Sequence, residues 1–111
     1  MLLMQYSVPV VKFDRHGYKP RERILCITNC ALYLLDAKDS KIKHRLTFNT
    51  ITGITVTNGM DNLILIRVPE DTATDKGDII LECRFLIETL TRMYEASGRN
   101  QEMIHFESKS S

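Results

Sequence analysis

A cluster of cations near the start of the chain is the strongest candidate for chemistry. Residues 12–23 contain five Lys or Arg side chains but only two acidic ones, Asp14 and Glu22, so this stretch carries a charge of +3. Cations held together repel one another unless they are neutralised, and phosphate suits arginine's paired donors as well as lysine's point charge. We therefore predict that this stretch binds a multiply phosphorylated group. The predicted contacts are Lys12, Arg15, Lys19, Arg21 and Arg23.

A second basic stretch follows, and the two stretches occupy neighbouring predicted hairpins. It consists of Lys38, Lys41, Lys43 and Arg45. Beside the first stretch, it would meet acidic lipid at about 1 kcal/mol per basic residue. Tyr18, in the first turn, either packs there or lies at a membrane interface. The charge pattern leaves one alternative open, in which the basic residues are simply a solvated hairpin tip.

Other chemistries lack the residues they need. The histidines are scattered, the glycines are isolated, and no serine or cysteine has a recognisable base partner. The acidic loop 70–78 lacks the alternation of a calcium loop. We expect no catalytic residue, no metal, no cofactor and no enzyme activity. A basic strand with aromatic residues for base stacking is also missing, so no nucleic-acid partner is expected.

The elements that must position the cations are short apolar runs separated by turn residues. A change of period near residue 85 then indicates an amphipathic helix. This order predicts a mostly β fold, an antiparallel seven-stranded barrel or sandwich with one C-terminal helix. Residues 103–106 either add a strand or fold back. The predicted strands are 8–13, 23–28, 31–35, 42–48, 51–57, 63–68 and 79–83, and the predicted helix is 85–96.

Alternation and spacing predict which faces are buried. In the fourth strand Ile42, His44, Leu46 and Phe48 share one face. In the helix we expect an apolar stripe, and Gly98 stands where a C-terminal cap belongs. The stripe consists of Leu86, Ile87, Leu90, Met93 and Tyr94.

Composition places the chain among globular proteins of the cytosol. Its 111 residues suit a single domain, and the longest apolar run, Cys30–Leu35, is too short to cross a bilayer. The three cysteines are expected to pack as reduced thiols. Residues 1–45 carry nine Lys and Arg against four Asp and Glu, whereas residues 46–111 carry six against ten. This asymmetry can orient a domain towards a polyanion.

Several segments, spread over about residues 6–106, resemble the tail homology domain of class I myosins. The most specific is Asp14-Arg-x-Gly-Tyr-Lys-Pro-Arg-x-Arg23. The absence of Trp from the final helix also favours the myosin branch over generic pleckstrin-homology domains. The other similar segments are Ile27–Asn29, Tyr33–Asp36, Lys41–Arg45, Ile51–Ile54 and Ile87–Thr91.

The resemblance implies a pleckstrin-homology-like fold that binds phosphatidylinositol bisphosphate and other anionic lipids. Lys12 and Arg23 match the family's headgroup signature, and Lys19 and Arg21 fit as supporting contacts. Such tails tether a single-headed actin motor to the plasma membrane or to endosomal membranes. Actin and ATP would be partners only through a motor domain, and calmodulin-like light chains only through a neck, neither of which is in this sequence.

Two expectations about the extent and role of the chain remain. The family's tail domain is longer upstream, so residues 1–111 are expected to form one domain that is truncated on its N-terminal side. The alternative function is a protein-interaction module of a cytoskeletal or scaffold protein, which would use a sheet edge or the helix groove to hold a peptide.

Overall fold

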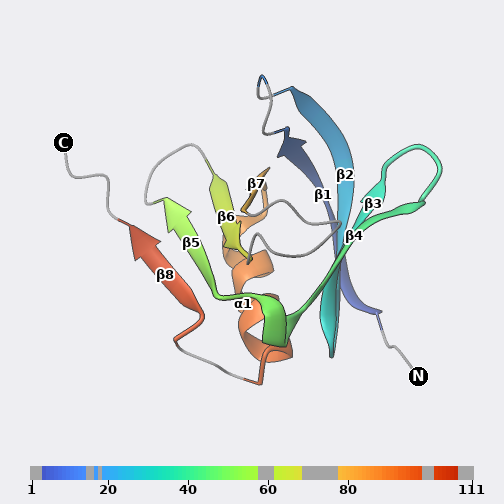
Figure 1. Cartoon of the computed structure of the whole chain (residues 1–111). Coiled ribbons are helices and arrows are strands. Elements are labelled where there is room, and N and C mark those ends of the chain that lie inside the picture. Colours follow the sequence, from blue (N-terminus) through green and yellow to red (C-terminus); the bar gives the residue numbers. More distant parts are fainter. Residues whose placement is uncertain are drawn as a thin grey trace.

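The computed structural model describes residues 4–14, 17, 19–57, 62–68, 78–98 and 102–107. These residues form eight strands, one 3-10 turn and one α-helix (Figure 1). The elements are β1 (Met4–Phe13), β2 (Pro20–Thr28), β3 (Ala31–Asp36), β4 (Ile42–Thr47), η1 (Phe48–Thr50), β5 (Gly53–Thr57), β6 (Leu63–Arg67), β7 (Ile79–Glu82), α1 (Leu86–Ala96) and β8 (Ile104–Glu107).

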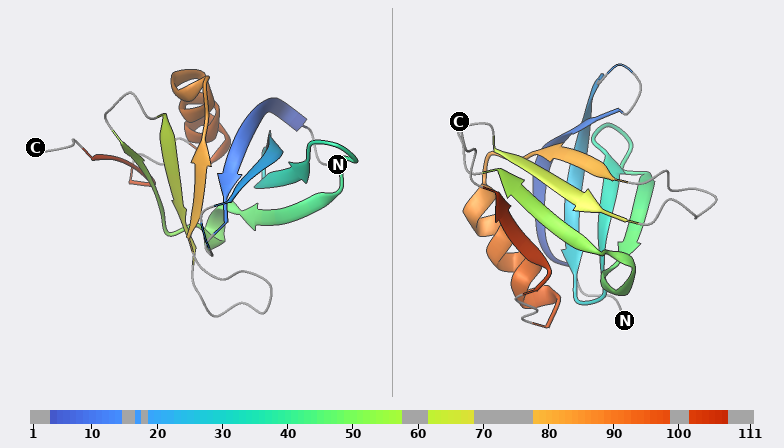
Figure 2. Two further views of the ribbon diagram at one scale, coloured as in Figure 1. Left: turned by 90° about the horizontal axis from the view of Figure 1, so that it is seen from above. Right: turned by 60° about the vertical axis from the view of Figure 1, so that its left-hand side comes forward.

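All eight strands belong to one bent sheet. Its order is β4-β3-β2-β1-β7-β6-β5-β8, so the first strand of the chain lies in the middle. Every pairing is antiparallel except that of β5 with β8. The sheet curls so that β1–β4 and β5–β7 face each other, and α1 lies across one end of the space between them (Figure 2). The apolar inner faces and the helix stripe form the main core.

The sequence-based fold class is confirmed, with one strand more than the seven expected. The additional strand is β8, which resolves the choice left open for residues 103–106 in favour of a strand. β1 begins earlier than predicted, at Met4, which extends it away from the cationic turn, and β2 begins at Pro20, which extends it towards that turn. The predicted turn at residues 58–59 and the loop 70–77 lie outside the described residues.

A two-residue turn at Asn29 and Cys30 sets the register of β2 and β3. Buried Thr28 holds this turn, because its hydroxyl donates to the Ala31 carbonyl at 3.2 Å and accepts from the Ala31 amide at 3.0 Å. The turn places Cys30 in solvent, whereas Cys26 and Cys83 are buried. The expectation that all three thiols would pack is therefore wrong for Cys30.

Helix α1 buries a narrower stripe than the spacing predicted. Leu90 and Met93 are buried as expected, but Ile87 is 72% exposed. Thr89 is fully buried in its place, because its hydroxyl hydrogen-bonds to the Tyr6 hydroxyl at 3.1 Å and to the Cys83 thiol at 3.2 Å. A hydroxyl with two partners can be buried at little cost.

The predicted cap of the same helix is confirmed. Gly98 has a φ of +80°, and its amide donates to the Glu95 carbonyl at 3.2 Å. A residue with a Cβ is strained at that φ, which explains why glycine ends the helix.

Strand β4 also departs from the predicted pattern at one position. Leu46 is buried and Phe48 packs against the core, but Ile42 is 60% exposed. The register of β3 and β4 shifts between Leu34 and Leu35, so that Ile42 pairs with Leu35. A bulge of this kind changes the face on which the following residues lie.

Candidate functional site

The cationic site begins where the core face of β1 and β2 changes from apolar to charged. Lys12 pairs with Arg21 across the two strands, and Val10 pairs with Arg23. Directly paired residues share a face, and so do alternate residues of one strand. Lys12, Arg21 and Arg23 therefore lie on the same face as buried Val10, beyond the end of the core.

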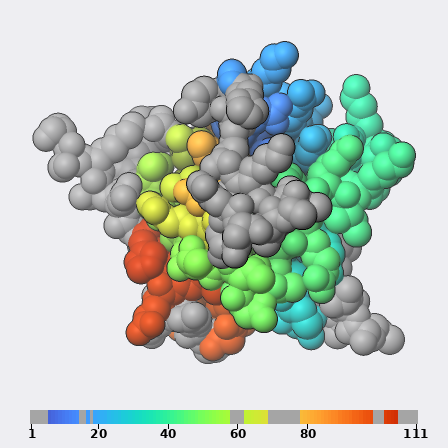
Figure 3. All heavy atoms as spheres, in the orientation of Figure 1, coloured from blue at the N-terminus to red at the C-terminus, as the bar shows by residue number. Residues whose placement is uncertain are grey.

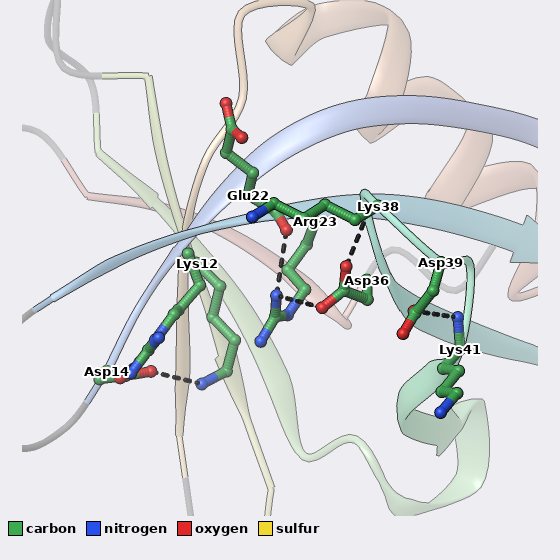
Figure 4. A network of polar contacts seen from close by, with 9 residues as sticks. Lys12, Asp14, Glu22, Arg23, Asp36, Lys38, Asp39 and Lys41 are labelled. Carbon is green, nitrogen blue, oxygen red and sulfur yellow. Dashed lines mark hydrogen bonds and ion pairs between the residues drawn. The ribbon is translucent and has the colours of Figure 1, made fainter.

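Strand β3 adds a carboxylate to this face. Arg23 pairs with Asp36, just as buried Leu25 pairs with buried Leu34 one step deeper in the core. Figure 4 shows the side chains of Lys12 and Arg23 projecting to one side of the sheet, while Glu22 projects to the other. The direct partner of Lys12 is Arg21, and Arg23 is its diagonal neighbour.

Two aspartates pair with the three cations and neutralise part of their charge. Asp14 accepts a hydrogen bond from Arg21 Nε at 2.9 Å, and its other oxygen lies 3.7 Å from Lys12 Nζ. Asp36 lies 3.5 Å from an Arg23 terminal nitrogen. The Lys12 and Arg23 side chains are each only 15% exposed. The repulsion expected among these cations is thus offset within the fold.

Arg23 retains an unused donor. One terminal nitrogen donates to the Glu22 carbonyl at 3.0 Å, but Nε is buried and has no hydrogen-bond partner among the described residues. A buried donor without a partner is costly, and an incoming acceptor removes that cost.

The surface beside these side chains is hollowed. A shallow depression of about 570 Å³ extends from the β1–β2 pair to the β3–β4 turn. Arg21, Arg23, Asp36 and Lys38 are among the residues that line it. Val11 and Glu22, which belong to the opposite face of the β1–β2 pair, line it as well, and Lys12 does not. The depression is therefore bordered by three cations and two carboxylates at the edge of the cationic face.

Both aspartates have lowered pKa values, for different reasons. The hydrogen bond from Arg21 is the main cause of the lowered pKa of Asp14. For Asp36 the main cause is the hydrogen bond from the Lys38 amide, which is 2.7 Å from its oxygen, with Arg23 contributing less. Asp36 is therefore fixed by the turn that follows it as well as by its ion pair.

These lowered pKa values predict an acid-dependent loss of stability. A carboxylate whose pKa is lower in the folded state stabilises the fold at neutral pH, and this contribution is lost as the pH falls through the folded pKa. We expect the free energy of unfolding to decrease below about pH 4, and to decrease less in the double variant Asp14→Asn, Asp36→Asn. Urea unfolding of both proteins at pH 7 and pH 3 measures this, and equal decreases would contradict it.

The remaining predicted site residues lie around this cluster. Lys19 is exposed just before β2, and its carbonyl accepts from the Asp14 amide at 2.9 Å, which closes the described part of the turn. Lys38, Lys41 and Lys43 are all exposed on the β3–β4 hairpin. Arg15 and Tyr18 lie outside the described residues.

Asp36 is the site residue that the sequence-based prediction missed. Its position could have been deduced, because a two-residue turn at 29 and 30 places residue 36 opposite residue 23. Within the described ranges, no cluster of three or more His, Cys, Asp or Glu side chains could hold a metal ion, and no helix has the length and hydrophobicity to cross a bilayer.

The chain matches known proteins over most of its length. Residues 3–111 match a family described as "Unconventional myosin tail, actin- and lipid-binding". Unconventional myosin-Ic of Rattus norvegicus is 43% identical over 96 residues, and unconventional myosin IC of Drosophila melanogaster is 44% identical over 95. Each alignment covers 86% of this chain but only 9% of the relative.

Solved structures support the fold independently. The Slm1-PH domain, solved in complex with inositol-4-phosphate, superposes with a TM-score of 0.66 at 9% identity, covering 88% of this chain and 97% of that one. A DH/PH fragment of PDZRHOGEF, solved with human RhoA, also gives 0.66, at 16% identity, covering 89% and 30%. At such low identity these matches establish the fold alone.

The matched region belongs to the tail of these proteins, and the fold is pleckstrin-homology-like. The chain is thus a binding module and not an enzyme. It belongs to the class I unconventional myosin tail family, whose members are described as actin- and lipid-binding.

Proposed function

We propose that this chain binds anionic phosphoinositides, with phosphatidylinositol bisphosphate as the type ligand. Lys12 and Arg23 are the principal contacts, and Arg21, Lys19 and Arg15 support them. In this proposal residues 1–111 act as one membrane-binding domain. The domain links an actin motor, carried elsewhere in the parent protein, to the cytoplasmic face of the plasma membrane or of endosomes.

The observation that carries the proposal is the transition from core to charge on three adjacent strands. Lys12, Arg21 and Arg23 extend one face, and their only described counter-ions there are Asp14 and Asp36. Three cations against two anions leave the site one positive charge. A phosphate group carries more acceptors than a carboxylate, and it would satisfy the unused Arg23 Nε donor once that side chain turns outward, since Nε is buried in this structure.

Exposed cations on the next hairpin support the membrane part of the proposal. Lys38, Lys41 and Lys43 are exposed, and Lys38 lines the same depression as Arg23. The described end of the β1–β2 hairpin and the β3–β4 turn lie on neighbouring parts of the surface (Figure 3). An anionic bilayer can therefore contact both tips while a headgroup occupies the site between them.

Vesicle co-sedimentation tests this function. We expect tight binding to phosphatidylcholine vesicles that contain phosphatidylinositol bisphosphate, and weaker binding at equal total charge when phosphatidylserine replaces it. Raising the salt from about 0.1 M to 0.5 M should weaken both, because exposed ion contacts are screened.

Equal binding to both lipids at equal charge would mean that the attraction is only electrostatic. No binding to either would exclude a lipid function and favour the protein-interaction alternative.

A further inference from the structure

A large apolar side chain is exposed in the middle of the basic hairpin. Ile42 is 60% exposed, and its chain neighbours Lys41 and Lys43 are exposed too. A fully buried isoleucine side chain contributes about 1.5–3 kcal/mol relative to an exposed one. Ile42 therefore does not contribute the stabilisation that the buried isoleucines of the sheet contribute.

A defined feature of the fold causes this exposure. The register shift between Leu34 and Leu35 pairs Ile42 with Leu35. As a result, Ile42 does not share the face of β4 on which buried Leu46 lies. Leu35 packs against a small second cluster around Cys26 and Tyr33, apart from the main core. The exposed position of Ile42 is thus built into the pairing of β3 and β4.

The charges around Ile42 select one kind of partner. Residues 37–45 carry four cations, Lys38, Lys41, Lys43 and Arg45, against the single anion Asp39. The Asp39 carboxylate accepts from the Lys41 amide at 3.0 Å and is therefore held within the turn (Figure 4). An apolar side chain surrounded by cations fits a surface with anionic groups outside and hydrocarbon beneath them, which describes an anionic bilayer.

Among the residues that the structure describes, the other large exposed apolar side chains lack this setting. Phe85 and Ile87 are 52% and 72% exposed at the start of α1. Residues 82–88 carry one cation, Arg84, against Glu82 and Glu88. This patch has a net negative charge, so it does not suit an anionic membrane and provides a control of the same chemistry.

We propose that Ile42 is a membrane anchor that enters the bilayer interface between the headgroups contacted by Lys41 and Lys43. The proposal rests on the lipid-binding function above and adds an apolar, salt-resistant contribution to it. The phosphate site selects the lipid, and Ile42 prolongs the stay of the domain on the bilayer once the charges have brought it there.

Because the chain contains no tryptophan, a single one can report on this position. The variant Ile42→Trp is mixed with phosphatidylcholine vesicles containing phosphatidylserine and phosphatidylinositol bisphosphate. We expect the emission to shift to the blue and to be quenched by brominated lipid. The variant Ile87→Trp, under the same conditions, should show neither effect.

A second variant measures the contribution of the side chain. Ile42→Ser should weaken vesicle binding about ten- to a hundredfold, as expected for the loss of a buried isoleucine. The slope of log affinity against log salt should not change, because no charge is removed. Ile87→Ser should bind as the unsubstituted chain does.

The outcomes separate the two proposals. If the unsubstituted chain sediments with the vesicles but Ile42→Trp shows no shift and Ile42→Ser binds normally, the anchor is wrong and the lipid function stands. If the unsubstituted chain does not sediment with either anionic lipid, the proposed function fails and the anchor fails with it.

Discussion

Arg23→Gln should reduce binding to phosphatidylinositol bisphosphate vesicles about ten- to a hundredfold. A hydrogen bond to a charged group is worth about 1.5–3 kcal/mol, which corresponds to that range of affinity. Arg23 is poised for such bonds, since its side chain is largely buried, one nitrogen pairs with Asp36 and Nε has no partner. Adding Lys12→Gln should abolish the preference over phosphatidylserine. Co-sedimentation over a lipid titration measures both effects.

The control for this prediction is Arg92→Gln, which removes the same charge from helix α1. Arg92 lies over the Tyr6 ring, 5.6 Å from its centre, and is outside the cationic site. Its binding should stay close to that of the unsubstituted chain. The fold should also survive Arg23→Gln, because Asp36 keeps its hydrogen bond from the Lys38 amide. If Arg92→Gln weakens binding as much as Arg23→Gln, the assigned site is wrong.

Leu25→Ala should have the largest effect on stability, lowering the free energy of unfolding by about 2–5 kcal/mol. Leu25 is fully buried on β2, between Val8 of β1 and Leu34 of β3. Removing its side chain leaves a cavity in the core, next to Arg23 on the same face of β2. Urea unfolding monitored by circular dichroism gives the value.

Two further variants keep this prediction testable if Leu25→Ala does not fold. Ile27→Val removes one methylene group from the same buried strand and should cost about 0.5–1.5 kcal/mol. Ile87→Ala truncates an exposed side chain and should change stability by no more than about 0.5 kcal/mol. A Leu25 variant as stable as the Ile87 variant would contradict the burial of β2.

Local patterns were sufficient to predict most of the strands and the helix. Apolar runs bounded by turn residues indicated β2 and β3, and the cap at Gly98 followed from one residue type. Lys12, Arg21 and Arg23 were named as contacts from their charge, and the hairpin pairing places them on one face. These features depend on residues that are close in sequence, so the local sequence pattern is enough to predict them.

Features that depend on distant parts of the chain were predicted less well. The bulge that exposes Ile42 arises between β3 and β4, and no residue type in either strand marks it. Thr89 is buried because Tyr6 and Cys83, which are remote in sequence, supply its hydrogen bonds. β8 is stabilised by β5, some fifty residues earlier, in a parallel pairing that a hairpin pattern cannot indicate.

The central place of β1 has a consequence for how the molecule is made. The backbone hydrogen-bonding groups along one edge of β1 can pair with β2 almost as soon as both strands have been synthesised. Those along the other edge stay unpaired until β7 has been synthesised. Until then a growing chain on the ribosome displays unpaired amides and carbonyls beside an apolar face, the condition under which nascent sheets misassociate. The cationic hairpin at the end of that same strand leaves the ribosome before β7 does, so its charge accompanies the exposed strand and opposes contact between like chains.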